Sequence, residues 1–135
     1  TIAHAHLGVY SFFSMVMFGS IYYIVPRLTG REWPSAALIK AHFWLVAVGM
    51  VIYWVALTWG GWYQGLEMNN PDIAFIDIVR STIPYLWSRT FAGVLMTAGH
   101  VVFAISLWLV FRPSARQIQG PTLFRQPAVE TGGEG

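Results

Sequence analysis

Cysteine is absent from this chain of 135 residues, and charged side chains are scarce. The lack of cysteine excludes disulfides, thiolate-ligated iron–sulfur clusters and c-type haem attachment within these residues. Only 10% of the residues are charged, against about 25% in ordinary soluble domains. The net charge of +2 is too small and too dispersed to indicate a nucleic-acid partner. With 56% hydrophobic and 16% aromatic residues instead, the composition is typical of a membrane protein.

Three apolar runs are each long enough to cross a bilayer, for which a helix needs about 20 residues. They predict membrane-spanning helices over about 1–26, 38–62 and 84–112. We expect Pro26 to stop the first helix, Gly60 and the glycine after it to end the second, and Pro84 to open the third behind a Thr82 cap. The expected fold class is all-α: a transmembrane helical bundle with three membrane-spanning helices, in one membrane domain over 1–112.

The segments between and after these runs are expected to be irregular. Residues 63–83 are predicted to form a long loop that carries a short interfacial helix over 73–79. Residues 113–135 are polar and rich in glycine, proline and arginine, and we expect them to be a disordered tail. Because Thr1 leads directly into an apolar helix, we expect the chain to be the carboxyl-terminal part of a longer one.

Basic residues set the expected orientation in the membrane. The loop after the first run holds Arg27, Arg31 and Lys40 against one acid, Glu32, and the segment after the third run holds further arginines. Three spans place both segments on one side, and the positive-inside rule makes that side cytoplasmic. The C-terminus is then cytoplasmic, and the beginning of the first helix lies toward the outer face.

His4 and His6 stand one residue apart at the head of the first apolar run. Residues i and i+2 of a helix point about 200° apart, so the two imidazoles cannot share one metal ion. Each can instead ligate the iron of a separate haem, one on either flank, with the irons roughly 12–15 Å apart. The small residue Gly8 leaves room for a macrocycle below His4. The alternative is that both are ordinary polar residues near the end of a span.

Three further polar residues lie within the spans. Arg89, about one turn inside the third run, is a candidate partner for haem propionates, because a guanidinium pairs with a carboxylate. The alternative is that Arg89 reaches the membrane interface, and Arg80 is a weaker candidate for the same role. We expect His42 to be an interfacial side chain. His100, in mid-membrane, is expected to donate or accept a hydrogen bond with a neighbouring helix, and Gly99 beside it indicates close packing.

The first third of the chain resembles a known family. The stretch Ala3-His-Ala-His-Leu-Gly-Val-Tyr10, the stretch from Met17 to Gly30, and Trp33-Pro34 resemble helix ten of the catalytic subunit I of cbb3-type cytochrome c oxidases, the C family of haem–copper oxidases. Gln64-Gly65, and Pro84-Tyr85 followed by Arg89 and Gly93, also fit. The resemblance covers about 1–112 and implies that these are the last three helices of a twelve-helix subunit.

The resemblance also implies a function. His4 would be the axial ligand of the high-spin haem b3, and His6 one axial ligand of the low-spin haem b. The ligands of copper B lie on earlier helices of the family, so no complete catalytic site is expected here. The implied activity is reduction of O2 to water with electrons from cytochrome c through haem b and a haem b3–copper centre, coupled to proton pumping. The implied partners are membrane lipid, the upstream part of the same subunit, c-type cytochrome subunits and cytochrome c, in a bacterial inner membrane.

Two alternative functions stay open. The catalytic subunit of a bacterial nitric oxide reductase is similar and carries the same histidine pair, but uses iron in place of copper. A non-catalytic haem-b membrane anchor is of a different class. Such an anchor would need both axial ligands of one haem, which requires His100 to face His4 or His6 at matching depth.

Overall fold

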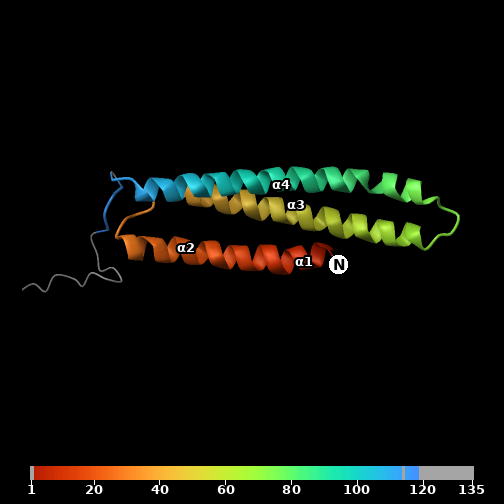
Figure 1. Cartoon of the computed structure of the whole chain (residues 1–135), viewed down its shortest axis with the longest axis horizontal. Coiled ribbons are helices and arrows are strands. Elements are labelled where there is room, and N and C mark those ends of the chain that lie inside the picture. The colour runs from red at the N-terminus through yellow and green to blue at the C-terminus, as the bar shows by residue number, and fades with distance from the viewer. Residues whose placement is uncertain (1, 114, 119–135) are drawn as a thin grey trace, which may run out of the picture.

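The computed structural model of the chain describes residues 2–113 and 115–118 as a bundle of long helices (Figure 1). The first rod is continuous and consists of α1 (Ile2–Ala5), the π-helix η1 (His6–Phe12) and α2 (Phe13–Thr29). It is followed by α3 (Ala36–Met68) and α4 (Phe75–Phe111). The rod, α3 and α4 are three helices long and apolar enough to cross a membrane. The predicted all-α transmembrane bundle is therefore confirmed.

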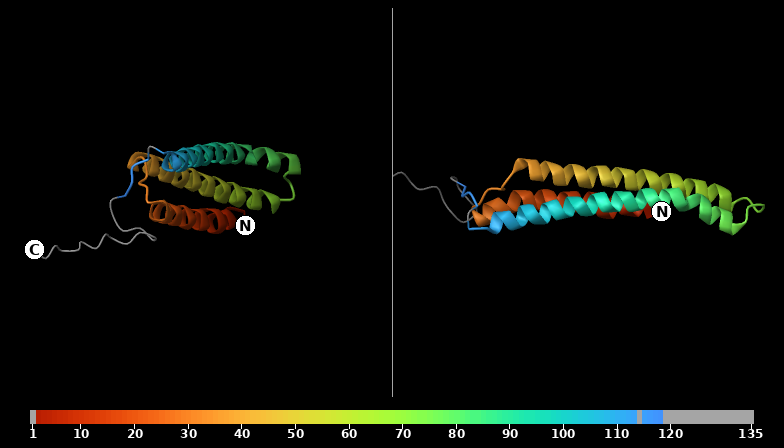
Figure 2. Two further views of the ribbon diagram at one scale, coloured as in Figure 1. Left: turned by 60° about the vertical axis from the view of Figure 1, so that its left-hand side comes forward. Right: turned by 90° about the horizontal axis from the view of Figure 1, so that it is seen from above.

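The helices α3 and α4 form an antiparallel hairpin, and the first rod lies along part of its length. The hairpin loop extends beyond the N-terminal end of the rod in both views of Figure 2. The opposite end of the bundle gathers the end of α2, the start of α3 and the end of α4 (Figure 1). The site residues near the N-terminus thus lie partway along the hairpin and not at its tip.

Glycines allow α3 and α4 to approach each other closely. A Cβ atom on Gly60 would lie 2.7 Å from Cγ of Tyr85, and one on Gly99 would lie 2.8 Å from Cγ2 of Val46. The buried apolar side chains of α3 and α4 include the small Ala56 and Ala92 beside larger ones: Val46, Met50, Tyr53, Ile78 and Val110. This is the small-residue packing by which membrane helices gain van der Waals contact.

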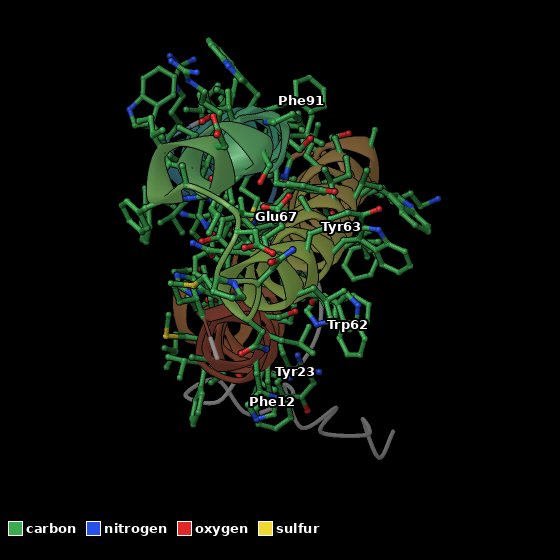
Figure 3. All side chains as sticks on the ribbon, turned by 90° about the vertical axis from the view of Figure 1, so that its right-hand side faces the viewer. Phe12, Tyr23, Trp62, Tyr63, Glu67 and Phe91 are labelled. Atoms are coloured by element: carbon green, nitrogen blue, oxygen red, sulfur yellow. The ribbon has the colours of Figure 1, made fainter. Side chains whose placement is uncertain are left out.

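Large apolar side chains cover the outside of the bundle. Figure 3 shows Phe12, Trp62 and Phe91 pointing away from the helices, whereas Glu67 lies between α3 and α4. Phe12, Trp62 and Phe91 are 65%, 69% and 61% exposed, respectively. The Glu67 carboxylate accepts a hydrogen bond of 2.5 Å from the Ser81 hydroxyl. An apolar exterior with polar groups turned inward suits a lipid environment.

Pro26 does not end the first helix, contrary to the prediction. The helix continues to Thr29 and ends at Gly30, whose φ of 66° is the left-handed conformation common at helix C-termini. Pro26 has no N–H to donate to the Tyr22 carbonyl one turn earlier. The indole N–H of Trp33 donates to that carbonyl instead, at 2.9 Å. The Tyr22 carbonyl, which lacks a donor inside the helix, therefore accepts a hydrogen bond from a side chain that follows the helix.

The hairpin loop is much shorter than predicted, because both of its helices are longer. Gly60 does not end α3; it is the point where Tyr85 packs against the helix, and α3 continues to Met68. Pro84 lies inside α4, which begins at Phe75. Thr82 is not a cap, since its hydroxyl donates to the Val79 carbonyl within the helix. The predicted long loop over 63–83 is therefore wrong, and its suggested short helix is the beginning of α4.

The two basic segments lie at the same end of the bundle, as three spans require. The Arg31 guanidinium donates to the carbonyls of Val110 and Arg112, at 3.2 and 3.1 Å. The backbone of Glu32 donates to Arg116, and Arg116 also pairs with the Glu32 carboxylate at 3.4 Å. Of the polar tail predicted over 113–135, the structure describes 113 and 115–118, of which Arg116 makes the contacts with Glu32, while 114 and 119–135 lie outside the described residues.

We expect Gly60→Ala to lower the free energy of unfolding by about 1–3 kcal/mol, because the added methyl group collides with Tyr85. Gly61→Ala is the matched control, since nothing lies within 4 Å of its Cβ position. Alanine favours helix over glycine by about 1 kcal/mol, so the control should be neutral or slightly stabilising. Denaturation of the protein in detergent measures both; equal effects would contradict the packing role of Gly60.

We expect Trp33→Phe to destabilise the protein by about 1 kcal/mol, because the Tyr22 carbonyl loses its donor. In a Pro26→Ala background the restored amide can donate to that carbonyl, so the same substitution should cost clearly less. Trp62→Phe, at an exposed position, controls for loss of an indole. Additive effects of Pro26→Ala and Trp33→Phe would show that the indole does not replace the missing amide.

Candidate functional site

His4 and His6 both lie on helical backbone near the start of the rod. His4 belongs to α1 and His6 is the first residue of η1, with Ala5 between them at φ −61° and ψ −43°. Both side chains are exposed. Two helical residues two positions apart leave the helix about 200° apart. The backbone therefore suits the expected arrangement with one imidazole on each flank.

The His6 ring is held by its own helix and faces α3. Its Nδ1 donates to the Ile2 carbonyl at 2.9 Å, and a carbonyl can only accept. This hydrogen bond places the proton on Nδ1 and leaves Nε2 with a free lone pair. The ring centroid lies 5.2 Å from that of Tyr53 on α3. His6 thus has the protonation and the fixed orientation of a metal-ligating imidazole.

The π-helix begins at His6 and covers the turn that follows it. A π-helix has i→i+5 hydrogen bonds, is rare, and often marks a functional site in a longer helix. Nothing lies within 4 Å of the Cβ position of Gly8 in this turn, so the space expected there is open. The sequence pattern alone predicted an ordinary α-helix, because the apolar periodicity does not distinguish the two.

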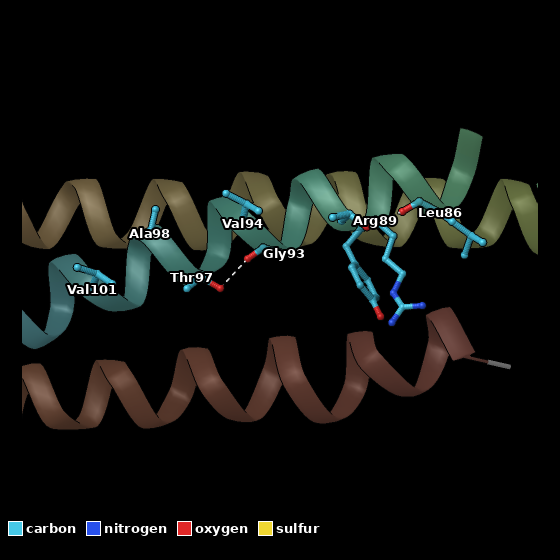
Figure 4. A pocket seen from close by; sticks show the side chains of 9 residues that line it. Leu86, Arg89, Gly93, Val94, Thr97, Ala98 and Val101 are labelled. Carbon is cyan, nitrogen blue, oxygen red and sulfur yellow. Dashed lines mark hydrogen bonds between the residues drawn. The ribbon is translucent and has the colours of Figure 1, made fainter. Parts of the chain in front are cut away.

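Tyr53 and Arg89 line a groove of about 820 Å³ along one face of α4. Its other walls are mostly small or aliphatic: Leu86, Thr90, Gly93, Val94, Thr97, Ala98 and Val101. Figure 4 shows the Arg89 side chain reaching from α4 toward the first rod. The volume is within the range of about 300–1,000 Å³ for sites that hold organic ligands. The His6 ring therefore lies against a residue, Tyr53, that borders this groove.

Arg89 borders a second cavity as well. This cavity of about 490 Å³ lies where Ile2 and Ala3 meet α3 and α4. The Arg89 side chain is exposed, and among residues 2–113 and 115–118 no carboxylate lies within 4.0 Å of its guanidinium. A guanidinium between two cavities, with no acid from this part of the chain beside it, is available to a carboxylate that enters either cavity.

A second polar cluster lies deeper in the bundle and was only half foreseen. The Tyr10 hydroxyl lies 3.2 Å from Nε2 of His100, which confirms the expected hydrogen bond between His100 and a neighbouring helix. The prediction for His42 is wrong: it is 2% exposed, and its Nδ1 lies 2.8 Å from the Tyr22 hydroxyl. Because α3 begins at Ala36, His42 lies well inside the helix. The sequence shows these two histidines and two tyrosines as polar residues in apolar runs. Only the fold shows which tyrosine bonds which histidine.

The sequence of the chain matches the family described as cytochrome c and quinol oxidase polypeptide I over residues 1–95. This chain belongs to that family. It is 36% identical to cytochrome c oxidase subunit 1 of Rhodobacter capsulatus, over 80% of this chain and 22% of the relative. It is 34% identical to a cbb3-type cytochrome c oxidase subunit of Stutzerimonas stutzeri, over 80% of this chain and 24% of the relative. The predicted resemblance to cbb3-type subunit I is thus confirmed.

A nitric oxide reductase subunit of Stutzerimonas stutzeri is also similar, at 30% identity over 78% of this chain and 24% of the relative. No solved structure gave a significant match. The chain spans about a quarter or less of the length of the relatives named here. The family comprises oxidoreductases of the haem–copper oxidase type. The three apolar helices and the oxidase relatives together point to a multi-pass membrane protein.

The residues near the N-terminus fit a haem group better than a metal ion bound by protein side chains. A free Nε2 on a fixed imidazole, an adjoining groove and a guanidinium without an acid partner match the iron, the macrocycle and the propionates of a haem. By contrast, no group of three or more histidine, cysteine, aspartate or glutamate side chains in the described part of the chain could hold a metal ion. A copper site does not fit these residues.

Proposed function

We propose that this chain is part of the catalytic subunit of a respiratory terminal oxidase, and that it supplies one axial ligand to each of two haems. The observation that carries this proposal is the pair His4 and His6 on one rigid rod, with His6 fixed in the ligating tautomer. Membership of the oxidase family and the likeness to a cbb3-type subunit support it. When bound, the two haems supply electron transfer and, together with copper, the reduction of O2 to water.

His6 is assigned to the low-spin haem b and His4 to the high-spin haem b3, following the resemblance of this stretch to helix ten of cbb3-type oxidases. The Ile2 carbonyl accepts the Nδ1 proton of His6, which orients the ring and makes Nε2 a better donor to iron. The helix between the two rings keeps them at a constant separation. The rigid rod, and no mobile loop, therefore sets the geometry between the two cofactors.

Arg89 is assigned to the haem propionates. It contributes a positive charge at the border of both cavities, where the described residues bring no acid to neutralise it. A propionate that pairs with it gains charge-assisted hydrogen bonds in a partly apolar site. Arg80, by contrast, already pairs with Asp77 at 3.7 Å and is largely exposed, which makes it the weaker candidate.

The remaining parts of the oxidase are proposed to come from outside this chain. The upstream part of the same subunit would supply the copper B ligands and the second axial ligand of haem b. Electrons would come from cytochrome c through c-type cytochrome subunits, and O2 reduction would be coupled to proton pumping. The site is proposed to lie in a bacterial inner membrane. The basic end formed by Arg31, Arg112 and Arg116 would face the cytoplasm, together with the C-terminus.

A nitric oxide reductase is the second candidate, because a subunit of such an enzyme is also similar to this chain. It would use the same two histidines with an iron in place of copper. The self-contained haem-b anchor is disfavoured by His100. That residue bonds Tyr10 through Nε2 and the Met96 carbonyl through Nδ1, so neither nitrogen is left to face His4 or His6.

We expect His6→Ala in the full-length protein to remove the low-spin haem b absorbance, and His4→Ala to abolish carbon monoxide binding to the reduced protein. The reason is that each substitution removes one axial ligand from a different haem. Absorbance spectra of the purified, reduced variants measure both effects. Val16→Ala, at an exposed position on the same rod, should leave both signals unchanged. Normal spectra in both histidine variants would contradict the ligand assignment.

We expect Arg89→Gln to lower the midpoint potential of a haem, because a lost positive charge favours the oxidised form. The shift should be roughly 40 mV for each kcal/mol of lost attraction. Arg89→Lys keeps the charge but not the paired hydrogen bonds, so it should shift the potential less. Redox titration followed by absorbance measures the change, with Arg80→Gln as the control. Equal shifts in the Arg89 and Arg80 variants would remove Arg89 from the site.

A further inference from the structure

Two tyrosine–histidine pairs lie one after the other between the first rod and the hairpin. Tyr10 bonds His100 on α4, and Tyr22 bonds His42 on α3. The ring centroids of the two histidines are 5.9 Å apart, with Phe18 edge-on to both. We call these four residues, Tyr10, Tyr22, His42 and His100, the tyrosine–histidine seam.

The seam runs lengthwise along the first rod. Tyr10 and Tyr22 are twelve residues apart on one rod, which corresponds to about 18 Å along a helix. The hydrocarbon core of a bilayer is about 30 Å thick. The Tyr10 end lies one turn from His6, and the Tyr22 end lies at the level of Trp33, next to the basic end of the bundle. The seam therefore links the basic end with the level of the histidine pair.

The hydrogen-bond roles of the two His100 nitrogens are determined by their partners, whereas one nitrogen of His42 has no partner among the described residues. The Met96 carbonyl lies 2.6 Å from Nδ1 of His100 and must accept its proton, so Nε2 of His100 accepts from the Tyr10 hydroxyl. At His42, only Nδ1 has a partner. Nε2 of His42 is buried, and no described residue gives it a hydrogen bond. Leaving such a group unsatisfied disfavours the folded state.

Water is the ligand that suits this atom. It can donate or accept, so it satisfies Nε2 of His42 whichever nitrogen carries the proton. A buried water needs polar partners, and the oxygen of Tyr10, bonded to His100 whose ring centroid is 5.9 Å from that of His42, keeps unused acceptor capacity. Ser106, on the same interface between α3 and α4, is also buried without a partner among the described residues. Two buried polar atoms, Nε2 of His42 and Oγ of Ser106, therefore lack a hydrogen-bond partner among the described residues.

We propose that the tyrosine–histidine seam holds water at Nε2 of His42 and is a proton-transfer path along the inner face of the first rod. The transfer is balanced without electrons. A proton entering at the Tyr22 oxygen displaces that hydroxyl's own proton to Nδ1 of His42, and the Nε2 proton passes to water. The water passes a proton to the Tyr10 oxygen, and the former Tyr10 proton transfers to Nε2 of His100, which then carries a proton on each ring nitrogen and the positive charge of the added proton. The use of this path in a proton-consuming reaction rests on the proposed function.

The water is tested first, on the full-length protein. A high-resolution map should show an ordered water within hydrogen-bonding distance of Nε2 of His42, and the water should be absent in His42→Phe. An unhydrated Nε2, or a side chain from an upstream helix bonded to it, would overturn the water site. This readout does not depend on haem or on activity.

Proton transfer is tested with the full-length protein in lipid vesicles, by proton uptake during O2 reduction. Tyr22→Phe removes one hydroxyl and should slow uptake roughly tenfold or more, since positioned proton donors contribute such factors. Tyr23→Phe is the matched control, because the neighbouring Tyr23 is exposed and points away from the seam. Equal uptake rates in the two variants would overturn the relay.

A structural role is separated from a relay by His42→Gln, whose amide can hydrogen-bond water but cannot exchange a proton between two ring nitrogens. It should keep the thermal stability of the protein and still slow proton uptake. Normal uptake in His42→Gln would contradict the path; if His42→Gln does not fold, Tyr10→Phe gives the same test. If the unaltered protein shows neither haem bands nor O2 reduction, the proposed function is overturned. The water at His42 is tested separately, because the high-resolution map shows it with or without activity.

Discussion

The position of the first rod depends on the two hydrogen bonds that join it to the hairpin. None of the residues of α2, all of which the structure describes, is buried, although Phe18 packs edge-on against Phe103 of α4. The pairs Tyr10–His100 and Tyr22–His42 are the polar contacts that cross from the rod to α4 and α3. In an apolar environment a broken pair leaves polar groups unsatisfied, which sets both the depth and the rotation of the rod.

That rotation determines what His4 and His6 can reach. With Tyr10 turned toward α4, His6 one turn earlier lies against Tyr53, and Tyr53 borders the groove that also contains Arg89. The same few contacts therefore connect the tyrosine–histidine seam with the residues around His6. Their arrangement explains how one short motif can sit beside two cavities although no three-ligand metal cluster exists in the described residues.

The long α3–α4 hairpin depends on a different constraint, the close approach of two backbones. Gly49, Gly60 and Gly99 lie where a Cβ would collide with the partner helix. Of these glycines, Gly60 was expected to end its helix, whereas Gly99 was expected to mark close packing, which the structure confirms. In a membrane, where every backbone group must be satisfied internally, packing against a partner outweighs the intrinsic preference. The two prolines likewise do not end their helices. The Trp33 indole replaces the N–H that Pro26 lacks, and α4 continues on both sides of Pro84.

The sequence by itself determined the three spans, the side on which basic residues gather, the opposed histidines and the family. These properties depend on composition and on residues close in the chain, where length, charge and helical rotation are sufficient. The continuation of α3 past Gly60, the pairing of His42 with Tyr22 and the open groove beside Arg89 were decided only by the tertiary structure. Each of them depends on which distant residue satisfies a polar atom or fills a space, and no local pattern in the chain specifies that partner.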